Sequence, residues 1–308
     1  MQAVTAVDPD SATNLLVACS GGADSLALAA AAHLAASHTG LATHAIVIDH
    51  GLQDGSAEVA AGVESQLRRL GYQHVRRVRV TVTDRGTGPE AAAREARYNA
   101  LSEAAEELDA VVLLGHTMDD QAETVLLGLA RGSGTRSLAG MPAQRGRFRR
   151  PLLGIRRRQT VAACAELGLR PWHDPHNADS SYTRVRVRER VLPVLATELG
   201  PGIVEALART AEQAAVDADL LDELAAEALE ELRTGEGELD VAELITRPAA
   251  IRHRVLLRWM RTSGARDLAH RHVLAVDQLL TDWRGQQGVD VPGMRVVRRA
   301  GRLNAVAG

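Results

Sequence analysis

Residues 15–36 read Leu-Leu-Val-Ala-Cys-Ser-Gly-Gly-Ala-Asp-Ser-Leu-Ala-Leu-Ala-Ala-Ala-Ala-His-Leu-Ala-Ala, and this stretch decides the fold. Its first four residues form a short apolar run, which predicts a buried strand. A glycine turn from Ser20 to Ser25 follows, and from Leu26 onward alanine and leucine, both strong helix formers, dominate the sequence. We therefore predict a strand, a tight turn and a helix.

The turn is suited to binding phosphate. A helix start presents unpaired N–H groups and a partial positive charge, and Gly21 and Gly22 let a ligand approach the backbone. Asp24 would repel phosphate by itself, so we interpret it as a ligand of a Mg²⁺ ion that bridges to the phosphates. An ordinary turn, in which Ser-Gly-Gly caps the helix, remains the alternative. A Walker A loop is excluded because all 36 basic residues are Arg and none is Lys.

The length of 308 residues is enough for two domains and a connecting region. We place a catalytic domain at 1–195, a helical linker at 196–233 and a small C-terminal domain at 234–308. Cys19 and Cys164 lie far apart and form no disulfide or metal-binding pattern, which favours a reducing compartment. No segment approaches 18 uninterrupted apolar residues, so we expect a cytoplasmic protein without a membrane partner.

Charge is strongly segregated along the chain. The net charge is −9 over residues 1–130, +10 over 131–190, −12 over 191–246 and +8 over 247–308. Fourteen arginines between residues 131 and 190, beside a candidate nucleotide site, favour a polyanionic substrate over an ordinary solvated surface. With one Phe, three Tyr and three Trp, the chain is poorly equipped to bind single strands on stacked aromatic side chains.

The remaining pattern alternates strands and helices. Residues 44–49 predict a second strand, 56–70 a helix, 75–82 a third strand and 88–107 a helix that begins with Pro89. Residues 111–114 predict a strand buried on both faces. We expect a doubly wound α/β fold with a mainly parallel sheet, followed by a long helix over 202–232. The last part predicts helices at 249–262 and 270–281 and paired strands at 289–291 and 294–298.

Three acids follow the strand at 111–114. Asp120 and Glu123 lie one turn apart on the same side of the next helix, and we place Asp119 at its cap. Clustered carboxylates repel one another unless cations intervene, and both Mg²⁺ on nucleotide phosphates and a positively charged substrate amine are plausible. Capping acids are the alternative, and they would explain Asp119 better than Glu123.

Arginines supply candidate anion contacts. Arg94, Arg97 and Tyr98 share one helix face, which suits phosphate or carboxylate binding, although a solvated face remains the alternative. His50 follows the second strand at its carboxyl end, where a ligand role competes with that of a plain loop histidine. Between residues 182 and 190, arginines alternate with valines.

The turn Ser20-Gly21-Gly22-Ala23-Asp24-Ser25 resembles the signature of the PP-loop ATP pyrophosphatases, enzymes that split ATP between the α and β phosphates and adenylate a substrate. Within that superfamily, five further segments resemble the tRNA(Ile)-lysidine synthase family. They are Asp49-His50-Gly51-Leu52, residues 88–98 with Gly-Pro-Glu-Ala-Ala-Ala-Arg-Glu-Ala-Arg-Tyr, residues 115–124, Arg131-Gly132-Ser133-Gly134 and the segment from Arg184 to Pro193.

The resemblance implies a PP-loop fold that is similar to the adenine nucleotide α-hydrolases, and it implies a ligase. The co-substrates would be ATP with Mg²⁺, free L-lysine and tRNA(Ile) with a CAU anticodon, and the product would be lysidine at the wobble cytidine. The oligomeric state stays open, with a homodimer as one alternative. The resemblance assigns catalysis to Asp24, Asp120, Glu123 and Arg188, and metal binding to Asp24, Asp119 and Asp120. It assigns nucleotide binding to Ser20, Gly21, Gly22, Ala23, Asp24, Ser25, Ile48, Gly115 and His116, and substrate binding to Arg94, Arg97, Glu123, Arg131, Arg136, Arg184 and Arg186.

One position departs from the family pattern, because Val185 stands where the family usually has Asn. Two other functions remain as alternatives. A tRNA thiolase of the same superfamily would need catalytic or iron–sulfur cysteines, and two isolated cysteines argue against it. A non-catalytic nucleotide-binding protein would have no reason for Asp119, Asp120 and Glu123 beside the turn.

Overall fold

The computed structural model describes residues 14–49, 55–82, 88–132, 134–174, 179–234 and 237–306. The chain divides into two compact units, which comprise residues 1–132 with 137–212, and residues 133–136 with 213–308. The predicted ligand position His50, with Gly51 and Leu52, lies outside the described residues.

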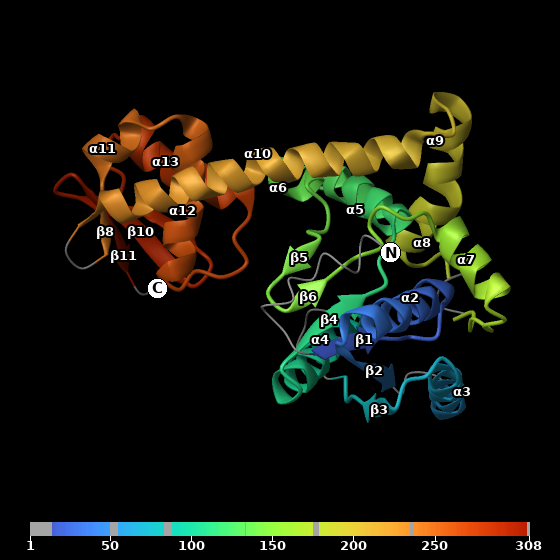
Figure 1. Ribbon diagram of the computed structural model, residues 1–308. Coiled ribbons are helices and arrows are strands. Elements are labelled where there is room, and N and C mark those ends of the chain that lie inside the picture. Colours follow the sequence, from blue (N-terminus) through green and yellow to red (C-terminus); the bar gives the residue numbers. More distant parts are fainter. Residues whose placement is uncertain are drawn as a thin grey trace. The chain divides into compact units, whose positions relative to one another are not determined.

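The first unit is built on a six-stranded sheet in the order β3-β2-β1-β4-β6-β5 (Figure 1). Neighbouring strands are parallel except for β5 and β6, which are antiparallel. The strands are β1 Asn14–Ala18, β2 Ala42–Asp49, β3 His74–Arg79, β4 Ala110–Leu114, β5 Gln144–Arg145 and β6 Phe148–Arg149. The mainly parallel sheet that the sequence predicts is confirmed.

Helices cover both faces of this sheet because each central strand is apolar on both sides. Leu15 and Val17 of β1 face a core shared with α2 (Ala23–Thr39), α3 (Ser56–Arg69) and α7 (Arg157–Glu166). Leu16, the residue between them, faces the opposite core with α4 (Pro89–Glu107). This alternation follows from the two-residue period of a strand. It makes the fold doubly wound.

The strand order reverses between β1 and β4. From β1 the chain builds outward through β2 and β3, and it then returns to place β4 on the other side of β1, with Ala18 opposite Leu114. Open α/β sheets bind ligands at such a reversal, outside the carboxyl ends of the strands. The turn after β1 and the residues after β4 both lie there.

The arginine–valine segment is helical. It forms α8 (Thr183–Arg186), a π-helical turn η2 (Val187–Val191) and α9 (Leu192–Leu199), with Pro193 in the first turn of α9. Val187 and Leu192 pack against Ala122 of α5 (Met118–Ala130). Arg184 and Arg188, one turn apart, therefore point toward α5 together.

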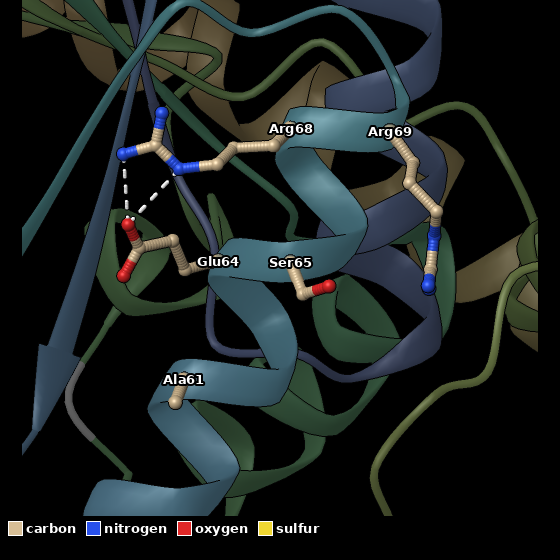
Figure 2. Close-up of a pocket in the computed structure, with 5 residues that line it drawn as sticks. All are labelled: Ala61, Glu64, Ser65, Arg68 and Arg69. Atoms are coloured by element: carbon tan, nitrogen blue, oxygen red, sulfur yellow. Dashed lines mark hydrogen bonds and ion pairs between the residues drawn. The ribbon is translucent and has the colours of Figure 1, made fainter.

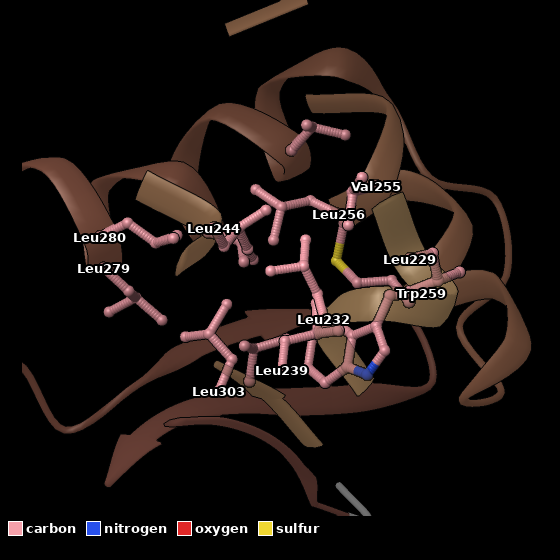
Figure 3. Packing of buried hydrophobic residues seen from close by; sticks show 14 of the residues in the cluster. Leu229, Leu232, Leu239, Leu244, Val255, Leu256, Trp259, Leu279, Leu280 and Leu303 are labelled. Carbon is pink, nitrogen blue, oxygen red and sulfur yellow. The ribbon is translucent and has the colours of Figure 1, made fainter. Parts of the chain in front are cut away.

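The second unit contains a five-stranded antiparallel sheet in the order β7-β8-β11-β10-β9. Helix α10 (Ile203–Leu232) runs from the first unit into the second. The core surrounds Trp259, which is completely buried and donates from Nε1 to the carbonyl of Gly237 at 2.8 Å (Figure 3). The other elements are α6 Thr135–Leu138, β7 Arg233–Thr234, β8 Glu238–Asp240, α11 Val241–Thr246, α12 Ala249–Thr262, α13 His270–Thr281, β9 Val289–Val291, β10 Met294–Arg299 and β11 Arg302–Val306.

Among the described residues, no single helix is long and apolar enough to cross a membrane. One pair of helical segments, Thr183–Leu199 and Ile203–Leu232, meets the length and composition requirement when taken together, but it is bent by 100°.

Candidate active site

The turn after β1 is shaped by close packing and by its own hydrogen bonds. Gly21 has φ +87°, and a Cβ there would collide with Val63 of α3, so only glycine fits. Gly22 is the N-cap of α2 and provides no side-chain cap, which leaves the first N–H groups of the helix without a side-chain acceptor. Ser25 ties the turn together: its Oγ donates to the carbonyl of Gly22 at 3.0 Å and accepts from the N–H of Ser20 at 3.2 Å.

The turn after β4 packs directly on the turn after β1. A Cβ on Gly115 would lie 3.1 Å from the backbone of Asp24 and 3.1 Å from the Cα of Ser25. The predicted residue Gly115 is therefore needed for the close approach of two loops. The predicted residue Ile48 lies near the end of β2, opposite Val78 of β3 and half-buried.

Helix α5 begins with a capping box that differs from the prediction. Thr117 is the N-cap, and the carboxylate of Asp120 accepts from Thr117 N at 2.8 Å and Oγ1 at 2.9 Å. The prediction that Asp119 caps this helix was wrong, because the side chain of Asp119 turns toward α7. It accepts from the N–H of Arg157 at 2.8 Å and from Nε of Arg156 at 3.1 Å.

Arg157 bridges three acids from two segments. Its Nε lies 3.2 Å from Oδ2 of Asp24, its Nη2 lies 2.8 Å from Oδ1 of Asp120, and its Nη1 lies 3.5 Å from Oε1 of Glu123. Thr160, one turn further along α7, donates to Asp24 as well. Asp24 and Asp120, which are distant in sequence, thus share one cation.

Glu123 is fully buried among arginines. Its side chain has 0% exposure, and Arg188 binds it with both Nε (2.7 Å) and Nη2 (3.1 Å). Arg184 adds a third contact through Nε at 2.7 Å. Arg186 points elsewhere and donates to the carbonyls of Ser180 and Ser181.

Burial disfavours the charged forms of Asp24, Asp120 and His116, and the other contacts of each group decide the direction in which its pKa shifts. Burial raises the pKa of Asp24, and the hydrogen bonds from Thr160 and Arg157 offset this only in part. Burial also opposes the charge on Asp120, but Arg157 and the Thr117 N–H outweigh it and lower the pKa of that carboxyl. Burial lowers the pKa of His116 to about 4, so the imidazole is neutral at pH 7.

A separate cationic cluster surrounds Tyr98. The guanidinium of Arg94 lies 4.9 Å from the centroid of the ring and that of Arg97 lies 5.5 Å from it, while Nη2 of Arg150 is 3.4 Å from the hydroxyl. Within the part of the chain that the structure describes, the Nε atoms of Arg97 and Arg150 are buried without a hydrogen-bond partner, as is Nδ1 of His116. Buried donors without acceptors are costly. This cluster is therefore suited to an anionic ligand.

The acids fit a Mg²⁺ ion that is shared with phosphate. Among the described residues, no three His, Cys, Asp or Glu side chains are grouped so that they could hold a metal alone. Asp24 and Asp120, however, contact one guanidinium through its Nε and Nη2 atoms, so the two carboxylates face the same cationic group. Mg²⁺ commonly binds one or two carboxylates and completes its shell with water and substrate phosphates.

The other two predicted arginines are Arg131 and Arg136. Arg131 is the exposed C-cap residue of α5, and Arg136 belongs to the second unit, where it pairs with Asp219 (2.7 Å) and Asp222 (2.5 Å). Sequence reasoning missed the contribution of Arg156, Arg157, Thr160 and Arg150. The charge pattern was the available signal, because a net −9 over residues 1–130 precedes a net +10 over 131–190.

A hollow on the outer face of α3 is unrelated to these groups. It is lined by Ala61, Glu64, Ser65, Arg68 and Arg69, and Arg68 is paired with Glu64 at 2.9 Å (Figure 2). None of these residues was predicted to bind a ligand.

The chain resembles known proteins over most of its length. Residues 1–195 match the family model of the PP-loop domain, and residues 239–303 match that of the TilS substrate binding domain. A tRNA(Ile)-lysidine synthase from Salinispora tropica is 55% identical over 300 residues, which cover 95% of this chain and 90% of the relative. One from Thermobifida fusca is 54% identical over 288 residues, covering 92% and 89%.

A solved structure supports the fold alone. The U34-tRNA thiolase NcsA from Methanococcus maripaludis superposes with a TM-score of 0.55 at 18% identity, covering 69% of this chain and 77% of the thiolase.

The glycine turn at the strand reversal, with acids after β4, defines a PP-loop protein of the ATP pyrophosphatase type. Within that class, the chain belongs to the tRNA(Ile)-lysidine synthase family.

Proposed function

We propose that this chain ligates free L-lysine to carbon 2 of the wobble cytidine in the CAU anticodon of tRNA(Ile), with ATP as co-substrate. The observation that carries the proposal is that the turn after β1 and the acids after β4 lie together at the strand reversal. The phosphate-binding turn after β1 and the acids Asp120 and Glu123 after β4 are bridged by Arg157. Nucleotide activation and capture of a cationic amine then occur in one place.

The first step is adenylation of the cytidine. Oxygen 2 of the base attacks the α-phosphorus of ATP, and pyrophosphate leaves. The turn from Ser20 to Ser25 would bind the phosphates through its backbone N–H groups, and Gly115 would keep the second loop in contact with it. Mg²⁺ held by Asp24 and Asp120 would neutralise charge on the phosphates. The neutral His116 would face the nucleotide without adding charge.

The second step is displacement of AMP. The bound lysine ammonium first loses a proton to solvent. The neutral amine then attacks carbon 2, the carbon–oxygen bond to AMP breaks, and the attacking nitrogen loses a second proton. We assign the amine to Asp120 and Glu123, and the stabilisation of the phosphate of AMP to Arg188, which Glu123 orients. The chain contains no Lys, so no lysine amine of the protein itself competes as nucleophile.

RNA phosphates are the ligands that we propose for the cationic cluster. Among the residues that the structure describes, Arg94 and Arg97 have no carboxylate partner in the cluster around Tyr98, whereas Arg184 is bound to Glu123. We keep 1–195, 196–233 and 234–308 as the functional division, with RNA contacts in the last part. Cytoplasmic location, and a homodimer as one possible assembly, remain proposals.

Incubation of the protein with ATP, labelled lysine and tRNA transcripts tests the reaction. We expect label in the CAU-anticodon isoleucine tRNA, with one AMP and one pyrophosphate formed per lysine incorporated. Methionine tRNA, which carries the same anticodon, is the matched control and should stay unlabelled. Label in both RNAs, or AMP formation without label, would contradict the proposed substrate pair.

A further inference from the structure

The acids of the site are already neutralised by arginines of the chain. Each of four carboxylates accepts from at least one of four guanidinium groups at 3.2 Å or less, and one of these, that of Arg156, also pairs with Glu205 at 2.6 Å. The acids are Asp24, Asp119, Asp120 and Glu123, and the arginines are Arg156, Arg157, Arg184 and Arg188. A cationic ligand would therefore meet carboxylates that are occupied. Such a ligand can bind well only if an arginine leaves.

Arg157 is the arginine that is best placed to leave. It spreads its contacts over three acids, two of them at 3.2 and 3.5 Å, whereas Arg184, whose side chain is similarly exposed (33% against 27%), approaches Glu123 to 2.7 Å. Arg188, by contrast, holds Glu123 with two contacts, at 2.7 and 3.1 Å. Arg157 is also the first residue of α7, and it touches Asp24, which lies inside the phosphate-binding turn. Nucleotide phosphates in that turn would come close to its guanidinium.

We propose that Arg157 is an exchangeable counter-ion that couples the binding of anionic and cationic ligands. Without nucleotide it neutralises Asp24 and Asp120. When the phosphates of ATP enter the turn, the guanidinium transfers to them. Asp24 and Asp120 then lose their shortest arginine contact, which lets Mg²⁺ and the substrate amine approach, while Arg184 and Arg188 stay 3.7 and 3.9 Å from Asp120. Arg157 is in this sense a positioning residue that sets the order in which the ligands bind. The identity of the amine as lysine rests on the proposed function, whereas the exchange itself does not.

The exchange has a thermodynamic consequence that is open to measurement. Coupling between two ligands is reciprocal, and it commonly amounts to about 5- to 150-fold in affinity. Nucleotide should therefore tighten lysine binding by at least about fivefold, because the cost of breaking the Arg157 contacts is then met by the phosphates. Removal of the guanidinium should give the same tight lysine binding without nucleotide.

Equilibrium binding of labelled lysine to the full chain tests this proposal, with α,β-methylene-ATP as the nucleotide because it cannot be split between those phosphates. Mg²⁺ is kept constant throughout. For the wild type we expect lysine affinity to rise at least about fivefold with nucleotide. For Arg157→Gln we expect tight binding in both conditions, with a difference of less than about twofold. Arg158→Gln, which removes the same charge from an exposed neighbour, should behave like the wild type.

A second readout uses Mn²⁺ in the absence of nucleotide. Free carboxylates bind the ion better than paired ones, so Arg157→Gln should bind Mn²⁺ at least about fivefold more tightly than the wild type and Arg158→Gln. If nucleotide leaves the lysine affinity of the wild-type protein unchanged, the proposed exchange is wrong. This measurement uses only the wild-type protein, so misfolding of a variant does not affect it. An Arg157→Gln protein with wild-type lysine coupling and Mn²⁺ affinity overturns it too.

The two proposals fail in different ways. If Arg157→Gln gains Mn²⁺ affinity while no form of the protein binds lysine, the exchange stands and the proposed substrate is wrong. If tRNA is labelled with lysine but nucleotide leaves lysine affinity unchanged, the proposed function stands and the exchange is wrong.

Discussion

At the scale of single residues, the environment of each charged group decides its role. Asp24 and Asp120 contact the same guanidinium, yet their pKa values shift in opposite directions. Burial dominates at Asp24, which has fewer donors, whereas Arg157, Thr117 and Arg184 together outweigh burial at Asp120. An added cation would therefore favour the charged form of Asp24 more than that of Asp120, which Arg157 already stabilises.

Asp24→Ala should abolish adenylation and largely spare tRNA binding, because it removes a metal-binding carboxylate and no RNA contact. Losing this ligand should slow formation of AMP and pyrophosphate on the order of hundredfold or more. Asp217→Ala, at an exposed position on α10, is the control. Wild-type rates of pyrophosphate release from Asp24→Ala would refute the metal role.

Glu123→Gln should weaken both stability and the use of lysine. The fully buried carboxylate holds Arg184 and Arg188, and removing one partner of such a network costs about 3 kcal/mol. For a unit of this size the unfolding temperature should fall by about 6 to 12 °C, as measured by calorimetry. Glu58→Gln, on the exposed surface of α3, should leave it unchanged. An unaltered unfolding temperature in Glu123→Gln would contradict a tightly paired carboxylate.

His116 should make stability depend on pH between about 6.5 and 4. Its folded pKa of about 4 lies below the unfolded value of 6.5, so in this range the unfolded chain binds a proton that the folded chain does not. The contribution of the neutral His116 to the free energy of unfolding is fully present above pH 6.5. It is lost as the pH falls toward 4, by about 3 kcal/mol in total. Denaturant unfolding at several pH values should show a smaller loss in His116→Asn. If His116→Asn and the exposed-site control His38→Asn gave equal slopes, this assignment would fail.

At the scale of elements, the site depends on loops that touch each other. The turn after β4 approaches the turn after β1 so closely that a Cβ on Gly115 would lie 3.1 Å from the backbone of Asp24, which is tighter than an ordinary contact. Helix α7 adds a third segment, because its first turn carries both Arg157 and Thr160 to Asp24. The geometry of the site therefore depends on the spacing between segments as well as on the identity of the charged residues.

Gly115→Ala should damage the site without altering any charge. The added Cβ would press on the backbone of Asp24 at 3.1 Å, and such overpacking costs about 1 to 3 kcal/mol. We expect a raised KM for ATP and a lower unfolding temperature. Gly62→Ala is the matched control, because a Cβ there meets nothing within 4 Å and alanine favours the helix. Equal ATP kinetics in the two variants would show that the loops can separate without loss.

At the scale of the whole molecule, charge is divided between internal pairing and exposed surface. Many arginines of residues 131–190 neutralise acids of the same chain, so fewer are available for RNA than their number suggests. In the C-terminal unit, Arg299 is exposed at the end of β10, while Arg302 is paired with Glu238 at 3.0 Å.

Arg299→Gln should flatten the salt dependence of tRNA binding. If this side chain contacts one phosphate, the log–log slope should fall by about 0.7 to 0.9. Arg302→Gln loses the same charge from a residue already paired within the protein, and it should change the slope less. Filter binding of the isoleucine tRNA at several salt concentrations measures both, and a larger change for Arg302→Gln would reverse the assignment.

The sequence by itself determined the main elements of the first unit, and it proposed the acids that the structure brings together. A glycine turn between a strand and a helix, valine-rich strands and helical periodicity are local patterns, and local patterns fix secondary structure. The order of strands and helices then implied a parallel sheet whose carboxyl ends gather the turn and the acids. The short elements β7, β8, α11 and β11 escaped prediction, because their three-dimensional pairing stabilises segments with little periodicity of their own.

Only the tertiary structure decided how the charges pair. Sequence spacing placed Asp119 at the helix cap, and the charge of residues 131–190 favoured a polyanionic substrate for their arginines. Helix α7, however, packs beside α2 and brings Arg156 and Arg157 to acids far away in sequence. Coulomb energy depends on distance in space, and a buried carboxylate needs a partner within a few ångströms. Neither requirement can be read from spacing along the chain, so the neutralised state of the site, and the part Arg157 has in it, emerged only from the fold.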